Sequence, residues 1–118
     1  MAALSDEIQR AIDQARKSEH GRHAELLVSD GPLRQTVIAS CRGVRLAEHN
    51  SPPPAASIQV IRGGRVRVTG QESVELPTGS IEALTHHRHS VEALDDSVFL
   101  LTTVTSIPPG KESYGDET

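Results

Sequence analysis

Histidines are the residues of this chain with the clearest capacity for chemistry, because three of them lie within the stretch 85–89, Thr-His-His-Arg-His. On a strand, residues two apart share a face and lie about 6–7 Å apart along the chain. His87 and His89 would then point the same way, with His86 and Arg88 on the opposite face. Imidazoles on one face are suitable ligands for zinc, iron, copper or nickel.

Two further residues could take part in chemistry, and for both we expect the simpler role. Cys41 is the only cysteine, so an intrachain disulfide is excluded, and its place in the apolar run 36–41 favours a small buried side chain over a nucleophile. Glu82 interrupts an otherwise apolar stretch. It is either an outward-facing residue or a pocket carboxylate, and we expect it to face outward.

The first segment, residues 1–21, is predicted to form a helix that ends near Gly21. Leu4, Ile8 and Ile12 recur at helical spacing and form one apolar stripe. A helix of this length is marginal by itself in water. The stripe must therefore pack on the rest of the protein or on a partner subunit.

Everything after Gly21 has the pattern of short strands and turns. Gly63 and Gly64 predict a two-residue hairpin. After them, Val66 and Val68 alternate with arginines, so we expect the valines inside and the arginines on a solvated face beside glutamates. The pattern predicts an antiparallel sandwich or barrel. The expected strands are 24–29, 34–41, 44–48, 57–62, 65–69, 73–76, 81–84, 90–94 and 97–105.

Composition limits the class of protein further. The 118 residues suit one domain, expected as a barrel over 22–107 with a disordered tail over 108–118. A net charge of −4 argues against nucleic acid as a partner. No stretch has the character of a signal peptide or a membrane span, so we expect a cytoplasmic protein. Phe99 and Tyr114 are the only aromatic residues, so the core must be aliphatic.

Residues 43–63 resemble the first motif of the cupin superfamily, which runs Gly, five residues, His, one residue, His, three or four residues, Glu, six residues, Gly. Gly43, His49 and Gly63 stand at their places with the motif's spacing. Ser51 occupies the place of the second His, and Ala56 occupies the place of the Glu. Two of the three metal-ligand positions of this motif are therefore lost.

Residues 79–93 resemble the second cupin motif with one residue fewer. Gly79 and His89 are kept, whereas Thr85, His87 and Ala93 stand where Pro, Gly and Asn are usual. Together the motifs are similar to those of small single-domain cupins of the RmlC-like type. The resemblance implies an all-β fold, an antiparallel double-sheet jelly-roll barrel with a ligand pocket inside.

The motif register implies where that pocket lies. His49 and His89 should look into one cavity, whose walls include residues of the same strand parity as Ala56. The cavity should be roomy, because the residues at two ligand places are smaller than His and Glu. The expected pocket residues are His49, Ser51, Ala56, Ile58, Val60 and His89.

Two functions are compatible with this resemblance. We favour a non-catalytic or metal-free protein that holds a small molecule in the barrel and forms a homodimer, as small cupins commonly do. The alternative is a metal-dependent enzyme, dioxygenase-like or isomerase-like, with a divalent zinc, iron, copper, nickel or manganese ion on His49, His89 and His87. In cupins, however, the stretch before the second-motif histidine is a turn, which would leave His87 in solvent.

Overall fold

The computed structural model describes residues 3–46, 55–70, 72–84 and 89–105, which contain one helix and nine strands. Each expected strand is found within two residues of its predicted limits wherever those limits are described, so the prediction of a mostly-β chain is confirmed. The predicted tail, 108–118, lies outside the described residues. The elements are α1 (Leu4–Lys17), β1 (Arg22–Asp30), β2 (Leu33–Ser40), β3 (Arg45–Leu46), β4 (Ala55–Gly63), β5 (Val66–Thr69), β6 (Ser73–Leu76), β7 (Ile81–Ala83), β8 (Ser90–Ala93) and β9 (Ser97–Val104).

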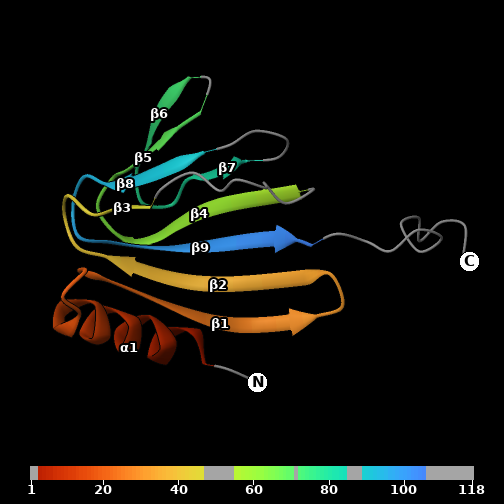
Figure 1. The fold of residues 1–118 in the computed structure, drawn as a ribbon, viewed down its shortest axis with the longest axis horizontal. Helices are drawn as coiled ribbons and strands as arrows, with labels where there is room; N and C mark the ends of the chain where they lie inside the picture. The colour runs from red at the N-terminus through yellow and green to blue at the C-terminus, as the bar shows by residue number, and fades with distance from the viewer. Residues whose placement is uncertain (1–2, 47–54, 71, 85–88, 106–118) are drawn as a thin grey trace, which may run out of the picture.

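The strands form two antiparallel sheets that face each other (Figure 1). The larger sheet has the order β1-β2-β9-β4-β7, and the smaller has the order β3-β8-β5-β6. Strands that follow each other in the chain mostly lie in different sheets, as a jelly roll requires. The predicted double-sheet jelly-roll fold is therefore confirmed.

The space between the sheets is filled by an aliphatic cluster around one aromatic ring. Phe99 from β9 is 1% exposed and is the largest of the fully buried side chains. Val66 and Val68 from the smaller sheet are buried in the same cluster, which confirms their predicted inward orientation. The buried members of this inner cluster are Ile38, Ile58, Val60, Val66, Val68, Leu76, Leu84, Val91 and Phe99.

Part of the outer face of the larger sheet is also buried, because α1 packs across β1 and β2 (Figure 1). Ile8 and Ala11 on the helix belong to the same cluster as Val37 on β2 and Val98 on β9. Most side chains of the apolar stripe are therefore covered by the larger sheet of the same chain, although Leu4 remains 44% exposed. Covering the helix does not require a partner subunit, and the homodimer stays a prediction.

Gly63 and Gly64 do not form the predicted hairpin, and that prediction is wrong. In the described pairings β4 joins β7 and β9, whereas β5 joins β6 and β8, so the two glycines carry the chain from one sheet to the other. The physical reason is a close approach: Gly63 has a φ of +91°, and a Cβ there would overlap the carbonyl oxygen of Asp96. Glycine is needed here so that two crossing segments can touch.

Four such connections cross between the sheets at one end of the barrel, which we call the crossover end. They are residues 41–44, 64–65, 77–80 and 94–96. Backbone hydrogen bonds tie them together: the Gly64 N–H donates to Asp96 O at 3.2 Å, and the Leu94 N–H donates to Arg65 O at 3.0 Å. The Gly43 N–H likewise donates to Ala93 O at 2.8 Å.

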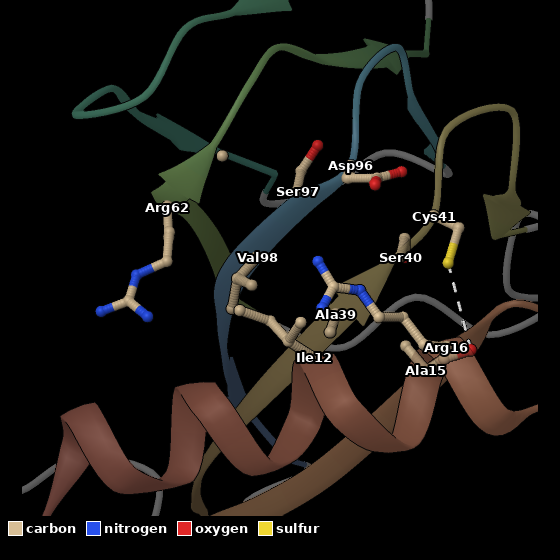
Figure 2. A pocket seen from close by; sticks show the side chains of 11 residues that line it. Ile12, Ala15, Arg16, Ala39, Ser40, Cys41, Arg62, Asp96, Ser97 and Val98 are labelled. Atoms are coloured by element: carbon tan, nitrogen blue, oxygen red, sulfur yellow. Dashed lines mark hydrogen bonds between the residues drawn. The ribbon is translucent and has the colours of Figure 1, made fainter.

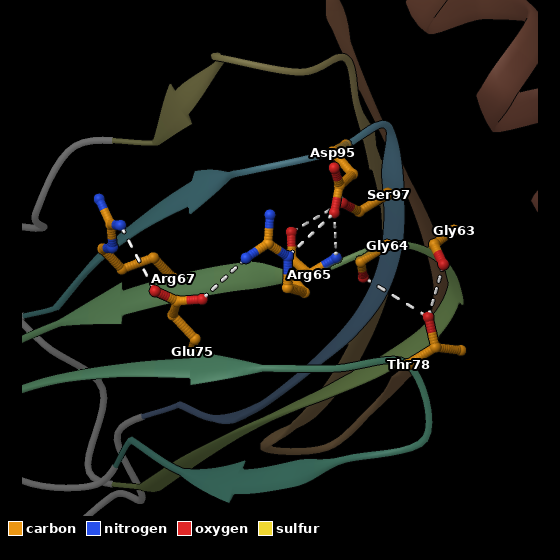
Figure 3. Close-up of polar contacts among 8 residues, drawn as sticks. All are labelled: Gly63, Gly64, Arg65, Arg67, Glu75, Thr78, Asp95 and Ser97. Atoms are coloured by element: carbon orange, nitrogen blue, oxygen red, sulfur yellow. Dashed lines mark hydrogen bonds and ion pairs between the residues drawn. The ribbon is translucent and has the colours of Figure 1, made fainter.

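Side chains reinforce the contact between the second and fourth connections (Figure 3). The Asp95 carboxylate accepts hydrogen bonds from the Arg65 backbone N–H at 3.0 Å and from its Nε at 3.3 Å. Ser97 donates its hydroxyl to Asp95 O at 2.5 Å, and Thr78 donates to Gly63 O at 2.6 Å. Arg65 also pairs with Glu75 at 3.2 Å, as expected for a solvated face.

Alanine substitution at two glycines separates backbone strain from steric overlap. Gly63 and Gly79 have nearly the same φ, +91° and +92°, but a Cβ on Gly79 would meet nothing within 4 Å. We expect Gly79→Ala to lower the free energy of unfolding by about 1 kcal/mol through its left-handed backbone alone. Gly63→Ala should lower it by about 3 kcal/mol, because overlap with Asp96 is added. Urea unfolding measures both, and equal losses would contradict the close approach.

The Asp95 carboxylate should make stability depend on pH in the acidic range. Hydrogen bonds from the Arg65 backbone, and then from its side chain, hold the pKa of Asp95 below its ordinary value. A lowered pKa means that the stabilisation is complete above the pKa of the unfolded chain and is lost as pH falls through the folded pKa. Asp95→Asn should therefore melt at a lower temperature than the parent at neutral pH. The two melting temperatures should converge in strong acid, and a gap that persisted there would refute this role.

Candidate functional site

A pocket of about 410 Å³ opens at the end of the barrel opposite the crossover end. It lies between β6 and β7, which are edge strands of the two different sheets and do not pair with each other in the described sheets. We call it the barrel-mouth pocket. The side chains that line it are Val68, Glu72, Ser73, Val74, Glu82, Ala83, Leu84 and His89.

Glu82 is a pocket carboxylate, so the expectation that it faces outward is wrong. It lies directly opposite Ile58 in the pairing of β7 with β4. Directly opposed residues in an antiparallel pair point to the same face, and Ile58 is fully buried between the sheets. The apolar neighbour Ile81 points outward instead and is 66% exposed. Leu84 lies two residues after Glu82, so an extended chain places both side chains on the same face, and Leu84 is buried. This apolar residue was the sequence signal that Glu82 points inward.

His89 lines the barrel-mouth pocket, immediately before β8, and is half-buried. His49, Ser51 and His87, the other polar residues of the predicted pocket and metal site, lie outside the described residues. The prediction that two histidines share one cavity therefore stays a prediction.

The expected apolar walls lie deeper in the barrel than His89. Ile58 and Val60 are fully buried in the inner cluster, and neither is among the side chains that line the barrel-mouth pocket. Ala56 is half-buried and packs against the same cluster. These residues form the packed interior behind the mouth.

The lining of the barrel-mouth pocket combines apolar side chains with acidic ones. Val68 and Leu84 are buried, and Val74 is partly exposed at the rim. Glu72 and Glu82 contribute carboxylates, which accept hydrogen bonds and donate none when ionised. Such a mixture of apolar wall and a few polar groups is typical of a small-molecule site.

The described residues do not fit a transition-metal site. Among them, no three His, Cys, Asp or Glu side chains converge as metal coordination requires. Ala56, at the place of the cupin motif's Glu, has only a methyl group and offers no ligand atom. Glu72, Glu82 and His89 share the pocket wall without forming such a cluster.

Sequence comparison finds no relative: no protein-family model matches the chain, and no curated protein matches it. In the described ranges, no helix has the length and apolarity needed to cross a membrane.

Solved structures, by contrast, match the fold over most of the chain. A conserved protein of unknown function from Streptococcus pyogenes, SPY1581, has a TM-score of 0.67 at 20% identity, covering 76% of this chain and 79% of that one. An RmlC-like cupin from Desulfovibrio desulfuricans has a TM-score of 0.61 at 20% identity, covering 70% and 81%.

A salicylate 1,2-dioxygenase from Pseudaminobacter salicylatoxidans has a TM-score of 0.71 at 15% identity, and the match covers 84% of this chain but 33% of the dioxygenase. Identities this low establish a shared fold and carry no information about activity. The order of the two sheets, the motif spacing and these structural matches agree with one another. The chain has the fold of a small RmlC-like cupin domain.

Proposed function

We propose that this cupin-fold protein is non-catalytic and holds a small molecule in the barrel-mouth pocket without the help of a metal ion. The observation that carries the proposal is the pocket itself, a cavity of about 410 Å³ with apolar walls and few polar groups. It lies between the two sheets, beside the ends of β5 and β7 and the beginnings of β6 and β8.

The lining favours a ligand with hydrogen-bond donors. Glu82 faces the barrel interior and Glu72 lies at the rim, so two carboxylates border the cavity. Glu82 is half-buried and Glu72 is exposed, and a carboxylate that loses water when a ligand binds needs a donor from that ligand. Ammonium or hydroxyl groups on the ligand would supply those donors, and its hydrocarbon part would contact Val68 and Leu84.

The loss of ligand atoms supports a metal-free protein. Ser51 and Ala56 stand where the cupin motif carries a His and a Glu, so the motif provides fewer donors for an ion. The alternative, an enzyme with a metal ion on His49, His87 and His89, needs a reduced ligand set.

Glu82→Gln tests the ligand site directly. A panel of small amines and polyols should include a compound that shifts the backbone amide signals of residues 68, 82–84 and 89 in an NMR titration. Glu82→Gln should weaken its binding about tenfold or more, because a hydrogen bond to a charged group is replaced by a neutral one.

Glu92→Gln is the matched control for this titration. Glu92 pairs with Arg67 at 3.5 Å on the solvated face of the smaller sheet, away from the pocket. Its substitution should leave the affinity unchanged. Binding that ignored Glu82→Gln, or shifts confined to other parts of the protein, would contradict the proposal.

Metal content separates the two functions. Protein purified without an affinity tag should contain less than one equivalent of any transition metal by elemental analysis. His49→Ala should leave the melting temperature almost unchanged, because no bound ion stabilises the native state through this residue. A full equivalent of one metal that disappears in His49→Ala would instead establish the metal-dependent alternative.

A further inference from the structure

The helix covers only part of the outer face of the larger sheet. Figure 1 shows α1 on the β1 side of this sheet, with β9, β4 and β7 progressively farther from it. Figure 2 shows the border of the covered part, where Ile12 and Ala15 of α1 face Ala39 on β2 and Val98 on β9. A pocket of about 240 Å³ lies at this border. Among the described residues, no helix or strand packs extensively on the outer face of β4 and β7.

The side chains that point outward from this part of the sheet form two rows of directly opposed residues. Taken from β9, β4 and β7 in that order, the rows are Leu100, Gln59 and Ile81, then Thr102, Ser57 and Ala83. They face outward because their strand neighbours Phe99 and Ile58 point into the barrel. We call these six residues the uncovered face. None of them carries a charge, and Arg62, at the end of β4, lies at the border with the helix.

The uncovered face meets solvent although much of it is apolar. Ile81 is 66% exposed, more than any other large hydrophobic side chain that the structure describes. Gln59 and Ala83 are also exposed. The Thr102 hydroxyl accepts a hydrogen bond from Gln35 at 3.2 Å, so it is satisfied within the sheet. The face therefore presents hydrocarbon and small neutral groups to its surroundings.

The outer face of the smaller sheet has the opposite character. One outward row across β3, β8, β5 and β6 consists of Arg45, Glu92, Arg67 and Glu75. Arg67 pairs with Glu75 at 3.6 Å and with Glu92 at 3.5 Å. Every residue of this solvated row is charged, whereas both rows of the uncovered face are neutral. Depletion of charge is typical of the centre of a protein–protein interface.

Charge also indicates which protein covers this face. The chain has a net charge of −4, so two copies repel each other in general. Contact through a surface without charge avoids local repulsion between them. Of the two outer sheet faces, only the uncovered face is neutral in the residues described, so the complement that the chain itself offers is the same face of a second copy. A two-fold axis closes such a contact and prevents open-ended assembly.

We propose that two copies of this chain pack uncovered face against uncovered face as a symmetric, reversible homodimer. Sheets in face-to-face contact lie about 10 Å apart. With the two-fold axis along β4, β9 of one protomer lies over β7 of its partner, and the exposed Ile81 is covered by the partner's Leu100. The helix stands beside the face and limits the contact to three strands. This surface is separate from the barrel-mouth pocket and does not depend on the proposed ligand.

The size of the uncovered face sets the strength of the dimer. Three strands about 4.8 Å apart and about six residues long give a flat area of roughly 300 Å² per copy. Even doubled for the relief of the side chains, this is less than the roughly 800 Å² of accessible surface that a standard interface buries on each partner. We therefore expect a dimer that dissociates in the micromolar range and is not permanent.

Sedimentation equilibrium between about 1 μM and about 1 mM measures this association. The average mass should rise from that of one chain toward that of two. Ile81→Glu should weaken the dimer about tenfold or more, because the symmetric contact would bury the new carboxylate twice without a partner. Gln59→Glu adds charge with almost no change of size and should weaken it similarly. Both positions are exposed, so the melting temperature of each variant should stay close to that of the parent.

Leu26→Glu is the matched control. Leu26 is 55% exposed on β1, the opposite edge of the same sheet. It lies in line with Thr36 and Leu101, and Leu101 packs against the inner cluster, so Leu26 belongs to the other face. This variant should leave the dimer unchanged, as should Glu82→Gln, which changes the proposed ligand site alone.

Three results would overturn the proposal. A parent protein that stays a single chain at about 1 mM would show that copies do not use this face, which would leave it to a different protein. A dimer that survives either Ile81→Glu or Gln59→Glu would place the contact elsewhere. Equal loss of the dimer in Leu26→Glu would place it on β1.

Discussion

The contact between the 64–65 and 94–96 connections is the constraint on which the rest of the structure depends. Gly63 approaches the Asp96 carbonyl so closely that only a residue without a Cβ fits, and Arg65 and Asp95 exchange backbone and side-chain hydrogen bonds beside it. At this contact the chain passes from β4 of the larger sheet to β5 of the smaller sheet, and from β8 of the smaller sheet to β9 of the larger one.

Burial of part of the larger sheet on both faces is the second organising feature. Alternation along β9 sends Phe99 into the barrel and Val98 under the helix, so one strand serves two cores. A chain with a single phenylalanine and no tryptophan fills both cores mainly with valine, isoleucine, leucine and alanine. The helix is thereby part of the fold, and its last turn brings Arg16 over the end of the sheet.

The two pockets follow from this arrangement, since each lies where a packed layer ends. At the crossover end, a pocket lies between the helix and the larger sheet, and Ala15, Ala39, Arg16 and Arg62 are among its lining residues. At the other end, the barrel-mouth pocket lies between the edge strands β6 and β7, beside carboxylates and His89. The carboxylates of Glu72 and Glu82 favour a donor-rich molecule in the barrel mouth.

Local pattern in the sequence determined the helix, the positions of the strands and the inward orientation of Val66 and Val68, and the resemblance to the cupin motifs implied the double-sheet fold. These depend on residues a few positions apart, where alternation and turn chemistry act directly. Tertiary structure alone decided that Gly63 and Gly64 cross between sheets, because the reason is contact with Asp96, more than thirty residues away. It also decided that Glu82 faces inward, through its pairing with Ile58, and that Arg16, Ser40 and Arg62 border one pocket. Which distant segments meet is set by packing of the whole chain, and no local pattern encodes it.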